Sequence, residues 1–367
     1  MKKNLIISTI IIAAFIFFLC VVNSSKRFDE DQALWRFNVN EVITSNPVSD
    51  NEFTYVRTVD ALYAINNSSG EQVWRAISEG DSPLALQPVL AENYIIVPEK
   101  YSRIAAFSLV SGDLLWRSPE IAPVFTSAEL VNIEAIAAEE NVAYVARFNW
   151  GITAYSLQSG NVIWDYDLQG RSNSYIALGE ELVIIGSGDK ITALHKHDGM
   201  FLWEIEINNG YVGPIVLDGD ILIATDEKNS KLFLIDIKRR SVILETNLNI
   251  EPYEINCVFG HNEAIFISAQ NLVLVAKESG QVVWKSKYVG RLECPIVWRD
   301  ILIVRSKKTS LFFVNRNTGD VIGEYMVPYN SIRKHVPDRG MTLSNDLLLV
   351  LVDNHTLFAI DLKKLDY

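Results

Sequence analysis

The chain has 367 residues, of which 49% are hydrophobic and 21% charged, so it can build a well-packed core and lacks the composition of a disordered protein. Its formal net charge of −12 argues against nucleic-acid binding, because phosphate contacts need clustered Lys and Arg. Its three cysteines include no CxxC spacing, which excludes a cysteine zinc cluster and a c-type haem attachment.

Residues 1–24 form a segment distinct from the rest of the chain. Two lysines precede 18 uncharged residues, Leu5 to Val22, which can cross the hydrocarbon core as a helix. We expect an uncleaved signal-anchor, a single pass through the inner (cytoplasmic) membrane that leaves the rest on the periplasmic side. Cleavage of a signal peptide after Ser24 and lipidation at Cys20 remain as alternatives. Residues 25–31 would form a short tether.

An internal repeat of about 40 residues fills the remainder of the chain. The phrase "ITAYSLQSGNVIWDYDL" at 152–168 recurs with a turn glycine and, in most copies, a Trp four residues later. Each unit holds four short runs rich in Val, Ile, Leu, Tyr and Phe, as expected for one blade of a β-propeller. Two degenerate copies place Arg240 and Leu365 at the glycine position, which makes eight units. The turn glycines are Gly70, Gly112, Gly160, Gly199, Gly280 and Gly319.

The repeated glycine and tryptophan have structural explanations. The glycine is predicted in the tight turn between the third and fourth strands, where a positive φ favours Gly. The tryptophan lies on the outer strand, where a large flat ring can pack between neighbouring blades. A small residue such as Ala154, six positions before the glycine, leaves room for the ring. We therefore predict packing roles for Trp35, Trp74, Trp116, Trp164, Trp203 and Trp284.

The two ends of the repeat region are complementary. The last unit lacks a fourth strand, whereas residues 32–38 form a fourth strand with no unit before it. We expect residues 32–38 to pair with the strand around Leu357 to Asp361. This pairing would hide the two open edges of the array. The sequence thus predicts an all-β, eight-bladed propeller closed by an N-terminal strand, with a single domain over residues 32–367.

Cys257 and Cys294 fall on the innermost strands of successive predicted blades, out of register by one residue. A disulfide needs Cα atoms within about 7 Å, and inner strands of adjacent blades often diverge beyond that. We expect two buried free thiols. A disulfide is the alternative, since an extracytoplasmic compartment is oxidising.

The phrase A-x-x-x-x-[ST]-G-x-x-hydrophobic-W resembles the tryptophan-docking repeat of the pyrroloquinoline-quinone-like propellers. The resemblance covers roughly residues 32–367 and looks closest to the BamB-like group, which has a single eight-bladed ring and an exported N-terminus. It implies a non-catalytic, protein-binding scaffold for envelope or outer-membrane protein assembly, with protein partners in the envelope and no cofactor. The fold alone does not imply function.

A quinone-dependent periplasmic dehydrogenase and a ligand-binding sensor are the alternatives. Quinone enzymes of this kind carry an adjacent-cysteine disulfide or catalytic His and Arg, with acidic and amide ligands for calcium. This chain has no Cys-Cys pair. His195 and His197 fall in a predicted turn, and "LDGD" at 217–220 reads as a hairpin turn. We expect no catalytic, cofactor-binding or metal-binding residues.

Two tryptophans depart from the repeat. Trp150 lies in a predicted loop between second and third strands, and Trp298 at the tip of a first hairpin on the opposite face. Because Trp is over-represented at binding hot spots, both are candidate partner contacts. A local packing role over a blade end is the alternative for each.

Charged loops suggest a third group of candidate contacts. Loops between strands 2 and 3 share one face with the loops that join blades, and we expect that face to be basic, rich in Tyr and suited to an acidic protein segment or anionic envelope component. The candidate contacts that we select on it are Arg103, Lys231, Arg291, Tyr211 and Arg333. The ten cations counted in the strand 2–3 segments are Arg57, Lys100, Arg103, Arg147, Lys190, Lys228, Lys231, Arg305, Lys307 and Lys308.

Overall fold

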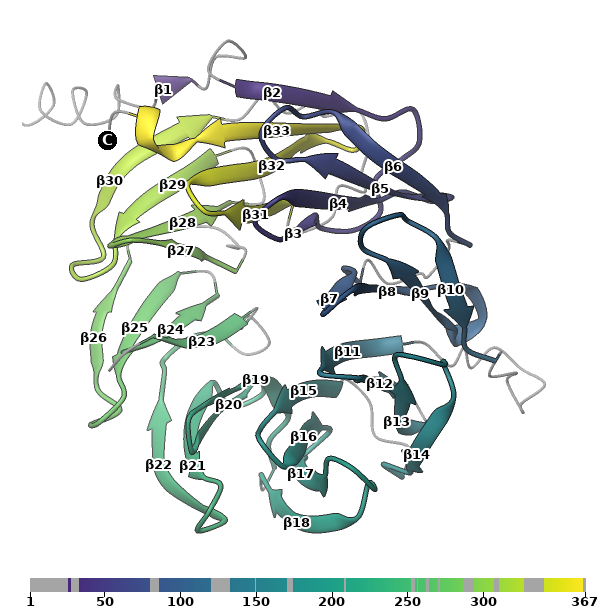
Figure 1. Cartoon of the computed structure of the whole chain (residues 1–367). Coiled ribbons are helices and arrows are strands. Elements are labelled where there is room, and N and C mark those ends of the chain that lie inside the picture. The colour runs from purple at the N-terminus through teal and green to yellow at the C-terminus, as the bar shows by residue number, and fades with distance from the viewer. Residues whose placement is uncertain are drawn as a thin grey trace, which may run out of the picture.

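The strands form eight sheets that surround a central opening (Figure 1). The computed structural model describes residues 26–27, 33–79, 86–119, 133–148, 150–169, 174–207, 209–251, 255, 257–261, 264–269, 271–286, 294–306, 310–326 and 340–365. The predicted all-β, eight-bladed propeller is confirmed. Over these residues no helix is long and apolar enough to cross a membrane, and the predicted span Leu5–Val22 lies outside them.

The first four blades are complete four-stranded antiparallel sheets. Blade 1 is β3 (Val48–Ser49), β4 (Phe53–Arg57), β5 (Ala61–Asn66) and β6 (Gln72–Ile77). Blade 2 is β7 (Val89–Ala91), β8 (Tyr94–Pro98), β9 (Ile104–Ser108) and β10 (Leu114–Arg117). Blade 3 is β11 (Ile133–Glu139), β12 (Val142–Arg147), β13 (Gly151–Ser156) and β14 (Val162–Tyr166). Blade 4 is β15 (Ser174–Leu178), β16 (Leu182–Ser187), β17 (Lys190–His195) and β18 (Phe201–Glu206).

The remaining blades include the two places where the N-terminal region joins the ring. Blade 5 is β19 (Val212–Asp218), β20 (Ile221–Asp226), β21 (Lys231–Asp236) and β22 (Ser241–Asn247). Blade 6 is β23 (Cys257–His261), β24 (Ala264–Ser268), β25 (Leu272–Ala276) and β26 (Val282–Lys285). Blade 7 is β27 (Ile296–Trp298), β28 (Ile301–Arg305), β29 (Ser310–Asn315) and β30 (Val321–Met326), with β1 (Lys26–Arg27) added. Blade 8 is β31 (Met341–Ser344), β32 (Leu347–Asp353), β33 (Thr356–Asp361) and β2 (Ala33–Asn38).

Burial follows the position of each strand within its blade. The second and third strands are almost continuously apolar, as in "LVIIGS" of β16, and nearly every residue in them is buried. Both faces of these strands are covered by neighbouring blades, which explains the absence of alternation. The outer strands alternate, so that β6 buries Trp74 and exposes Val73 on the other face.

The predicted ring closure is confirmed. Strand β2 pairs antiparallel with β33, placing Trp35 opposite Ala359 and Phe37 opposite Leu357. The structure differs from the prediction within residues 25–31, which were expected to form only a tether. Lys26 and Arg27 form β1 and pair in parallel with Tyr325 and Met326 of β30. The N-terminal region therefore contributes a strand to each of two adjacent blades.

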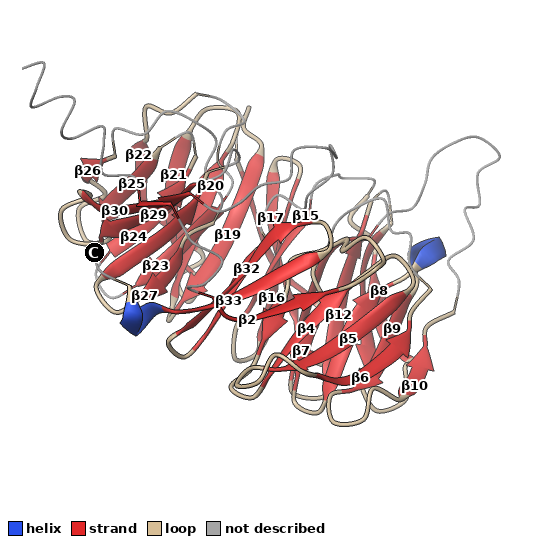
Figure 2. Ribbon diagram, turned by 90° about the horizontal axis from the view of Figure 1, so that it is seen from above, coloured by secondary structure: helices blue, strands red, loops and turns tan. Residues whose placement is uncertain are grey.

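The ring has two faces that are used throughout the following description. The hairpin face carries the turns between strands 1 and 2 and between strands 3 and 4. The joining face carries the loops between strands 2 and 3 and the loops from one blade to the next. Two 3-10 helices mark these faces, η2 (Lys100–Ser102) on the joining face and η3 (Leu362–Lys364) on the hairpin face. They lie on opposite sides of the ring in Figure 2.

Four consecutive junctions, from blade 8/1 to blade 3/4, are built in the same way. The Trp of one blade lies on the turn glycine of the next, so that a Cβ atom placed at Gly112 would lie 2.6 Å from the Trp74 ring. Each of these glycines has a positive φ of 71 to 74°. The indole N–H of each Trp donates to a backbone carbonyl three residues before the glycine, at distances of 2.5 to 3.0 Å, in the pairs Trp35–Asn67, Trp74–Leu109, Trp116–Leu157 and Trp164–Lys196.

The other four junctions depart from this pattern. Trp203 meets blade 5, where Arg240 replaces the glycine with a φ of 57°. Leu244 stands at the Trp position of blade 5 and contacts Gly280. Trp284 lies on Gly319, but its buried indole nitrogen has no hydrogen-bond partner among the described residues. Blade 7 has Gly323 where a Trp would stand, and there Trp298 donates to the Asp346 carboxylate of blade 8 at 2.9 Å.

The expectation of two free thiols is wrong. Cys257 and Cys294 form a disulfide, with their Cα atoms 5.4 Å apart. Cys257 begins β23, whereas Cys294 lies two residues before β27, so the innermost strands of blades 6 and 7 approach closely at the joining-face end. The sequence places the two cysteines out of register by one residue. This offset does not prevent the bond, because Cys294 lies outside the regular strand.

Candidate partner-binding surfaces

Trp150 projects from a constrained loop on the joining face. The loop joins β12 to β13, and the Trp150 side chain is 40% exposed. The Trp150 amide donates to the Arg147 carbonyl, and Gly151 follows with a φ of 139°. A Cβ atom at Gly151 would lie 2.1 Å from the Tyr166 carbonyl oxygen, so only glycine fits there. A large aromatic side chain is thus exposed next to a glycine whose position tolerates no other residue.

Arg147, whose carbonyl accepts the Trp150 amide, is held in place by its own side-chain contacts. Its guanidinium is fully buried and donates to the Ser102 carbonyl, the Thr153 hydroxyl and the Tyr155 hydroxyl. Burial lowers the pKa of Arg147, because desolvation disfavours the charged form. The three neutral acceptors and the Tyr155 ring, 5.4 Å from the guanidinium, compensate for part of the lost solvation.

The structure shows the environment of six of the ten cations that were expected to make the joining face basic. Arg57, Arg147 and Arg305 are buried at the ends of their strands. Three further cations form ion pairs with carboxylates on adjacent strands or segments: Arg103 with Glu79, Lys190 with Glu204, and Lys231 with Glu245. The count of charges from the sequence did not include these carboxylates. Six of the ten predicted cations (three buried and three paired) therefore add little net positive charge to this surface.

The other predicted contact residues occupy different environments. Tyr211 is partly buried in the loop from blade 4 to blade 5, and its amide donates to Asp226. Arg291 and Arg333 lie outside the described residues. Trp298 is only 6% exposed and belongs to the core between blades 7 and 8, with Arg299 stacked 4.6 Å from its ring centroid. The structure therefore places Trp298 in a packing environment with little surface to offer a partner.

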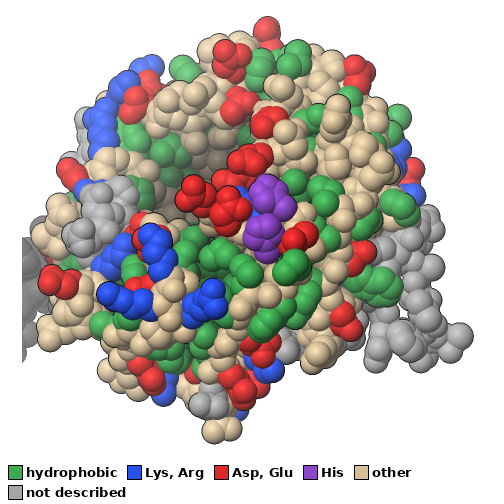
Figure 3. Space-filling model, turned by 60° about the horizontal axis from the view of Figure 1, so that its bottom comes forward, with side chains coloured by type: hydrophobic (Ala, Val, Ile, Leu, Met, Phe, Trp, Pro, Cys, Tyr) green, Lys and Arg blue, Asp and Glu red, His purple; other side chains and the backbone are tan. Residues whose placement is uncertain are grey.

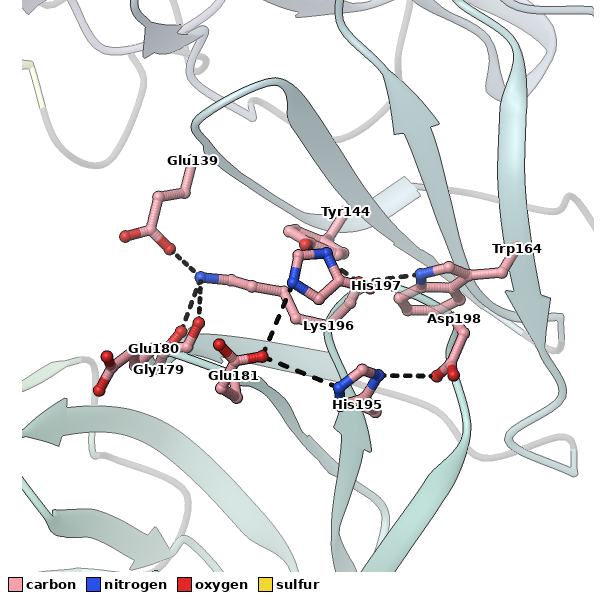
Figure 4. A network of polar contacts seen from close by, with 10 residues as sticks. All are labelled: Glu139, Tyr144, Trp164, Gly179, Glu180, Glu181, His195, Lys196, His197 and Asp198. Atoms are coloured by element: carbon pink, nitrogen blue, oxygen red, sulfur yellow. Dashed lines mark hydrogen bonds and ion pairs between the residues drawn. The ribbon is translucent and has the colours of Figure 1, made fainter.

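The hairpin face contains a polar network at blade 4 (Figure 4). Lys196 lies in the turn between β17 and β18 and is 6% exposed. Its ammonium group donates to the Glu139 carboxylate of blade 3 and to the Gly179 carbonyl. Its own carbonyl accepts the Trp164 indole N–H. Lys196 therefore connects the tryptophan-docking contact of junction 3/4 to the Glu139 carboxylate of blade 3.

Two histidines flank Glu181 in the same network. The Glu181 Oε2 atom lies 3.8 Å from His195 Nε2 and 3.6 Å from His197 Nε2. His195 Nδ1 is 2.9 Å from Asp198 Oδ1, which orients the ring. The Met200 amide hydrogen bond lowers the pKa of Asp198, with a smaller effect from His195. The sequence shows the two histidines but not Glu181, because strand pairing brings Glu181 from the preceding hairpin.

Exposed apolar side chains adjoin this network. Met200 is 62% exposed and Phe201 is 52% exposed, and the Met200 carbonyl accepts the His195 amide. In Figure 3 hydrophobic surface lies beside the two adjacent histidines and a group of acidic side chains. An apolar centre with a charged rim is typical of protein interfaces. We call this surface the blade-4 corner, and it comprises Glu181, His195, His197, Met200 and Phe201.

A cleft of about 460 Å³ lies on the hairpin face between blades 8 and 1. Asn67 and Ser344, both buried, hydrogen bond across it at 3.0 Å, and Ser344 also donates to the Asp50 carbonyl. These contacts join the C-terminal blade to blade 1. The cleft is therefore part of the ring closure.

Among the described residues, no three His, Cys, Asp or Glu side chains are arranged to hold a metal ion.

The comparisons with known proteins agree with the fold and the repeat. A family model described as "Outer membrane protein assembly factor BamB" matches residues 24–178 and 149–243, together more than half of the chain. The chain belongs to this family. The match ends at residue 243, immediately before Leu244 replaces the docking tryptophan.

Individual relatives are distant. An outer membrane protein assembly factor BamB from Shewanella oneidensis is 25% identical over 295 residues, covering 72% of this chain and 72% of that protein. The corresponding Yersinia pestis protein is 24% identical over 218 residues, covering 56% of this chain and 54% of that protein.

Solved structures show the same architecture. The crystal structure of BamB from Moraxella catarrhalis aligns with a TM-score of 0.68 at 14% identity, covering 89% of this chain and 98% of that one. The quinohemoprotein alcohol dehydrogenase from Comamonas testosteroni aligns with a TM-score of 0.70 at 11% identity, covering 94% and 79%. At these identities the likeness concerns the fold alone.

Proposed function

We propose that this protein is a non-catalytic scaffold for protein assembly in the cell envelope, in keeping with its family. The observation that best supports a protein-binding role is Trp150, an exposed aromatic side chain on a loop constrained by Arg147 and Gly151. A rigid aromatic anchor loses little side-chain entropy on binding and is typical of interface hot spots. The proposed contact is an apolar pocket or groove of a partner protein on the joining face.

The blade-4 corner is a second candidate contact. Glu139, Glu140, Glu180, Glu181 and Asp198 supply five carboxylates around it, and the Lys196 ammonium group pairs with one of them. With Met200 and Phe201 exposed beside them, this surface suits a protein segment that carries an apolar side chain next to a cationic one.

We further propose that residues 1–24 anchor the chain in the inner membrane and that residues 32–367 form the extracytoplasmic ring. Fractionation of cells that produce the full chain would test the anchor, because an uncleaved anchor keeps the protein in the inner membrane after washing with high salt. A cleaved soluble form or an outer-membrane lipoprotein would contradict it.

Crosslinking in intact cells tests the contact surfaces. The partners captured by the full chain should be components of outer-membrane protein assembly, identified by mass spectrometry. Trp150→Ala should reduce their recovery about tenfold, as expected for loss of a hot-spot tryptophan. Val110→Ala, at a 77% exposed residue in the turn between β9 and β10, is the matched control and should leave recovery unchanged. Equal recovery from both variants would contradict the Trp150 contact.

Phe201→Ser tests the contact at the blade-4 corner. Ile77→Ser on blade 1 is the control, because the wild-type Ile77 side chain is 72% exposed. Loss of capture with Phe201→Ser alone supports this contact. Reduction of a redox dye by the purified chain with pyrroloquinoline quinone and alcohols would contradict the non-catalytic assignment.

A further inference from the structure

The Cys257–Cys294 disulfide joins neighbouring blades at a particular place in the ring. It connects β23 of blade 6 to the segment before β27 of blade 7, across a sequence separation of 37 residues. Closing a loop of this length stabilises a fold mainly by restricting the unfolded chain.

The bond spans junction 6/7, where Trp284 covers Gly319 but the docking contact is incomplete, and it lies next to junction 5/6, where the tryptophan is missing. At junction 5/6, Leu244 replaces the tryptophan, although Gly280 keeps the positive φ of 67° that the docking turn uses. At junction 6/7, the Trp284 indole nitrogen is buried without a partner among the described residues. The junctions from 8/1 to 3/4 each have both the glycine and the indole hydrogen bond.

Forming the bond requires an oxidant. Two thiols lose two electrons and two protons, which pass to the disulfide of a donor that leaves as a dithiol. In the folded ring Cys294 is partly buried, whereas Cys257 is only 8% exposed. The Cys294 thiolate can therefore attack the donor disulfide to give a mixed disulfide, and the Cys257 thiolate then displaces the donor sulfur.

We propose that Cys257 and Cys294 are a modification site for an extracytoplasmic dithiol oxidase, and that the resulting bond is a covalent clamp that reinforces the incomplete tryptophan docking between blades 6 and 7. The oxidase step rests on the proposed extracytoplasmic location, whereas the clamp does not. An oxidising compartment keeps such a bond formed, and a reducing one would not.

The clamp is tested with the full chain carrying Cys20→Ser, purified in mild detergent. This substitution leaves Cys257 and Cys294 as the only cysteines that a reductant can affect. Reduction should lower the melting temperature to that of the Cys257→Ser/Cys294→Ser variant and raise proteolytic cleavage within blades 6 and 7 about tenfold, with blades 1–3 unchanged. Reduction that changes neither quantity, or that accelerates cleavage in all blades alike, overturns the clamp.

Restoring the docking residue provides an independent test. Leu244→Trp should recover part of the melting temperature lost on reduction, because Gly280 is already in the docking conformation. Ile243→Trp is the control, since Ile243 is 49% exposed on the same strand and faces away from that contact. Equal recovery by both variants contradicts the idea that the disulfide compensates for incomplete docking around blade 6.

Thiol labelling tests the oxidation step. Oxidised glutathione should form a mixed disulfide faster with the folded Cys257→Ser variant, which retains Cys294, than with Cys294→Ser. In intact cells a maleimide reagent should leave both cysteines unlabelled unless a reductant is added first. Labelling without reductant overturns the oxidase step and contradicts the extracytoplasmic location, while leaving the partner-contact tests unaffected.

Discussion

The four blade junctions from 8/1 to 3/4 use one repeated contact, whereas those from 4/5 to 7/8 each use a different one. In the first group, which we call the regular half, an indole ring covers a turn glycine and donates to a backbone carbonyl. In the second group, the irregular half, the contacts include Leu244 on Gly280, the Cys257–Cys294 disulfide and the Trp298–Asp346 hydrogen bond. A ring can therefore close although half of its junctions depart from the repeated motif in at least one part.

Glycine substitutions should show the largest difference between the halves. Gly112→Ala would strain a φ of 74° and push its Cβ against the Trp74 ring, so we expect a loss of about 3–5 kcal/mol. Gly280→Ala has a similar φ of 67°, but its Cβ meets rotatable atoms of Leu244 and Thr246, so we expect about 1–2 kcal/mol. Chemical denaturation of both variants measures the difference, and equal losses would contradict a special role for the tryptophan ring.

Removing the indole nitrogen should have a smaller effect. Trp74→Phe loses the hydrogen bond to the Leu109 carbonyl and leaves that acceptor unpaired, at a cost of about 1–2 kcal/mol beyond the change of ring size. Trp284→Phe loses no such bond and removes an unpaired buried donor, so its cost should be lower by about that amount. The free energies of unfolding of the two variants decide this. A greater loss for Trp284→Phe would show that its nitrogen is hydrogen bonded in solution.

Arg240 offers a stabilising change in the irregular half. Its φ of 57° is unfavourable for a residue with a side chain, so Arg240→Gly should stabilise the fold by about 0.5–1 kcal/mol. Arg239→Gly is the matched control, because Arg239 is not among the described residues with positive φ, and it should be neutral or destabilising. The melting temperatures of the two variants test this, and stabilisation by both would point to charge rather than backbone conformation.

The smallest expected effect is a pH dependence at junction 7/8. The hydrogen bond from Lys363, followed by that from Trp298, lowers the pKa of Asp346 below its usual 3.8. The folded state therefore binds fewer protons than the unfolded state, and the stability from Asp346 is complete above pH of about 4 and lost as the pH falls through the folded pKa. The melting-temperature difference between wild type and Asp346→Asn should be constant from about pH 5 to 7 and shrink at lower pH. A difference that grows on acidification would contradict this sign.

The fold could be predicted from the sequence because its signal is local and repeated. Gly160 and Trp164 lie four residues apart, and the same spacing recurs with apolar runs between, so no knowledge of distant contacts was needed. The closure by residues 32–38 followed from counting strands. Local patterns did not predict β1, because a two-residue strand carries no periodicity.

The candidate contact surfaces depend on contacts between segments far apart in sequence, and they were predicted less completely. Glu245 neutralises Lys231 from the adjacent strand, and Glu181 reaches His195 from another hairpin. The Cys257–Cys294 pair required the distance between inner strands of two blades, which composition and spacing leave open. The exposure of Trp150 could be predicted because its surroundings are local in sequence. Its side chain is 40% exposed, and its amide donates to the Arg147 carbonyl three residues before it.

Native-state hydrogen exchange on the full chain, analysed by mass spectrometry in increasing denaturant, tests the difference between the two halves most directly. With the disulfide reduced, amides in β23 to β30 should exchange through a partial opening at lower denaturant than amides in β4 to β13, which open only with global unfolding. Exchange of all blades through one common transition, with identical denaturant dependence, would contradict the account.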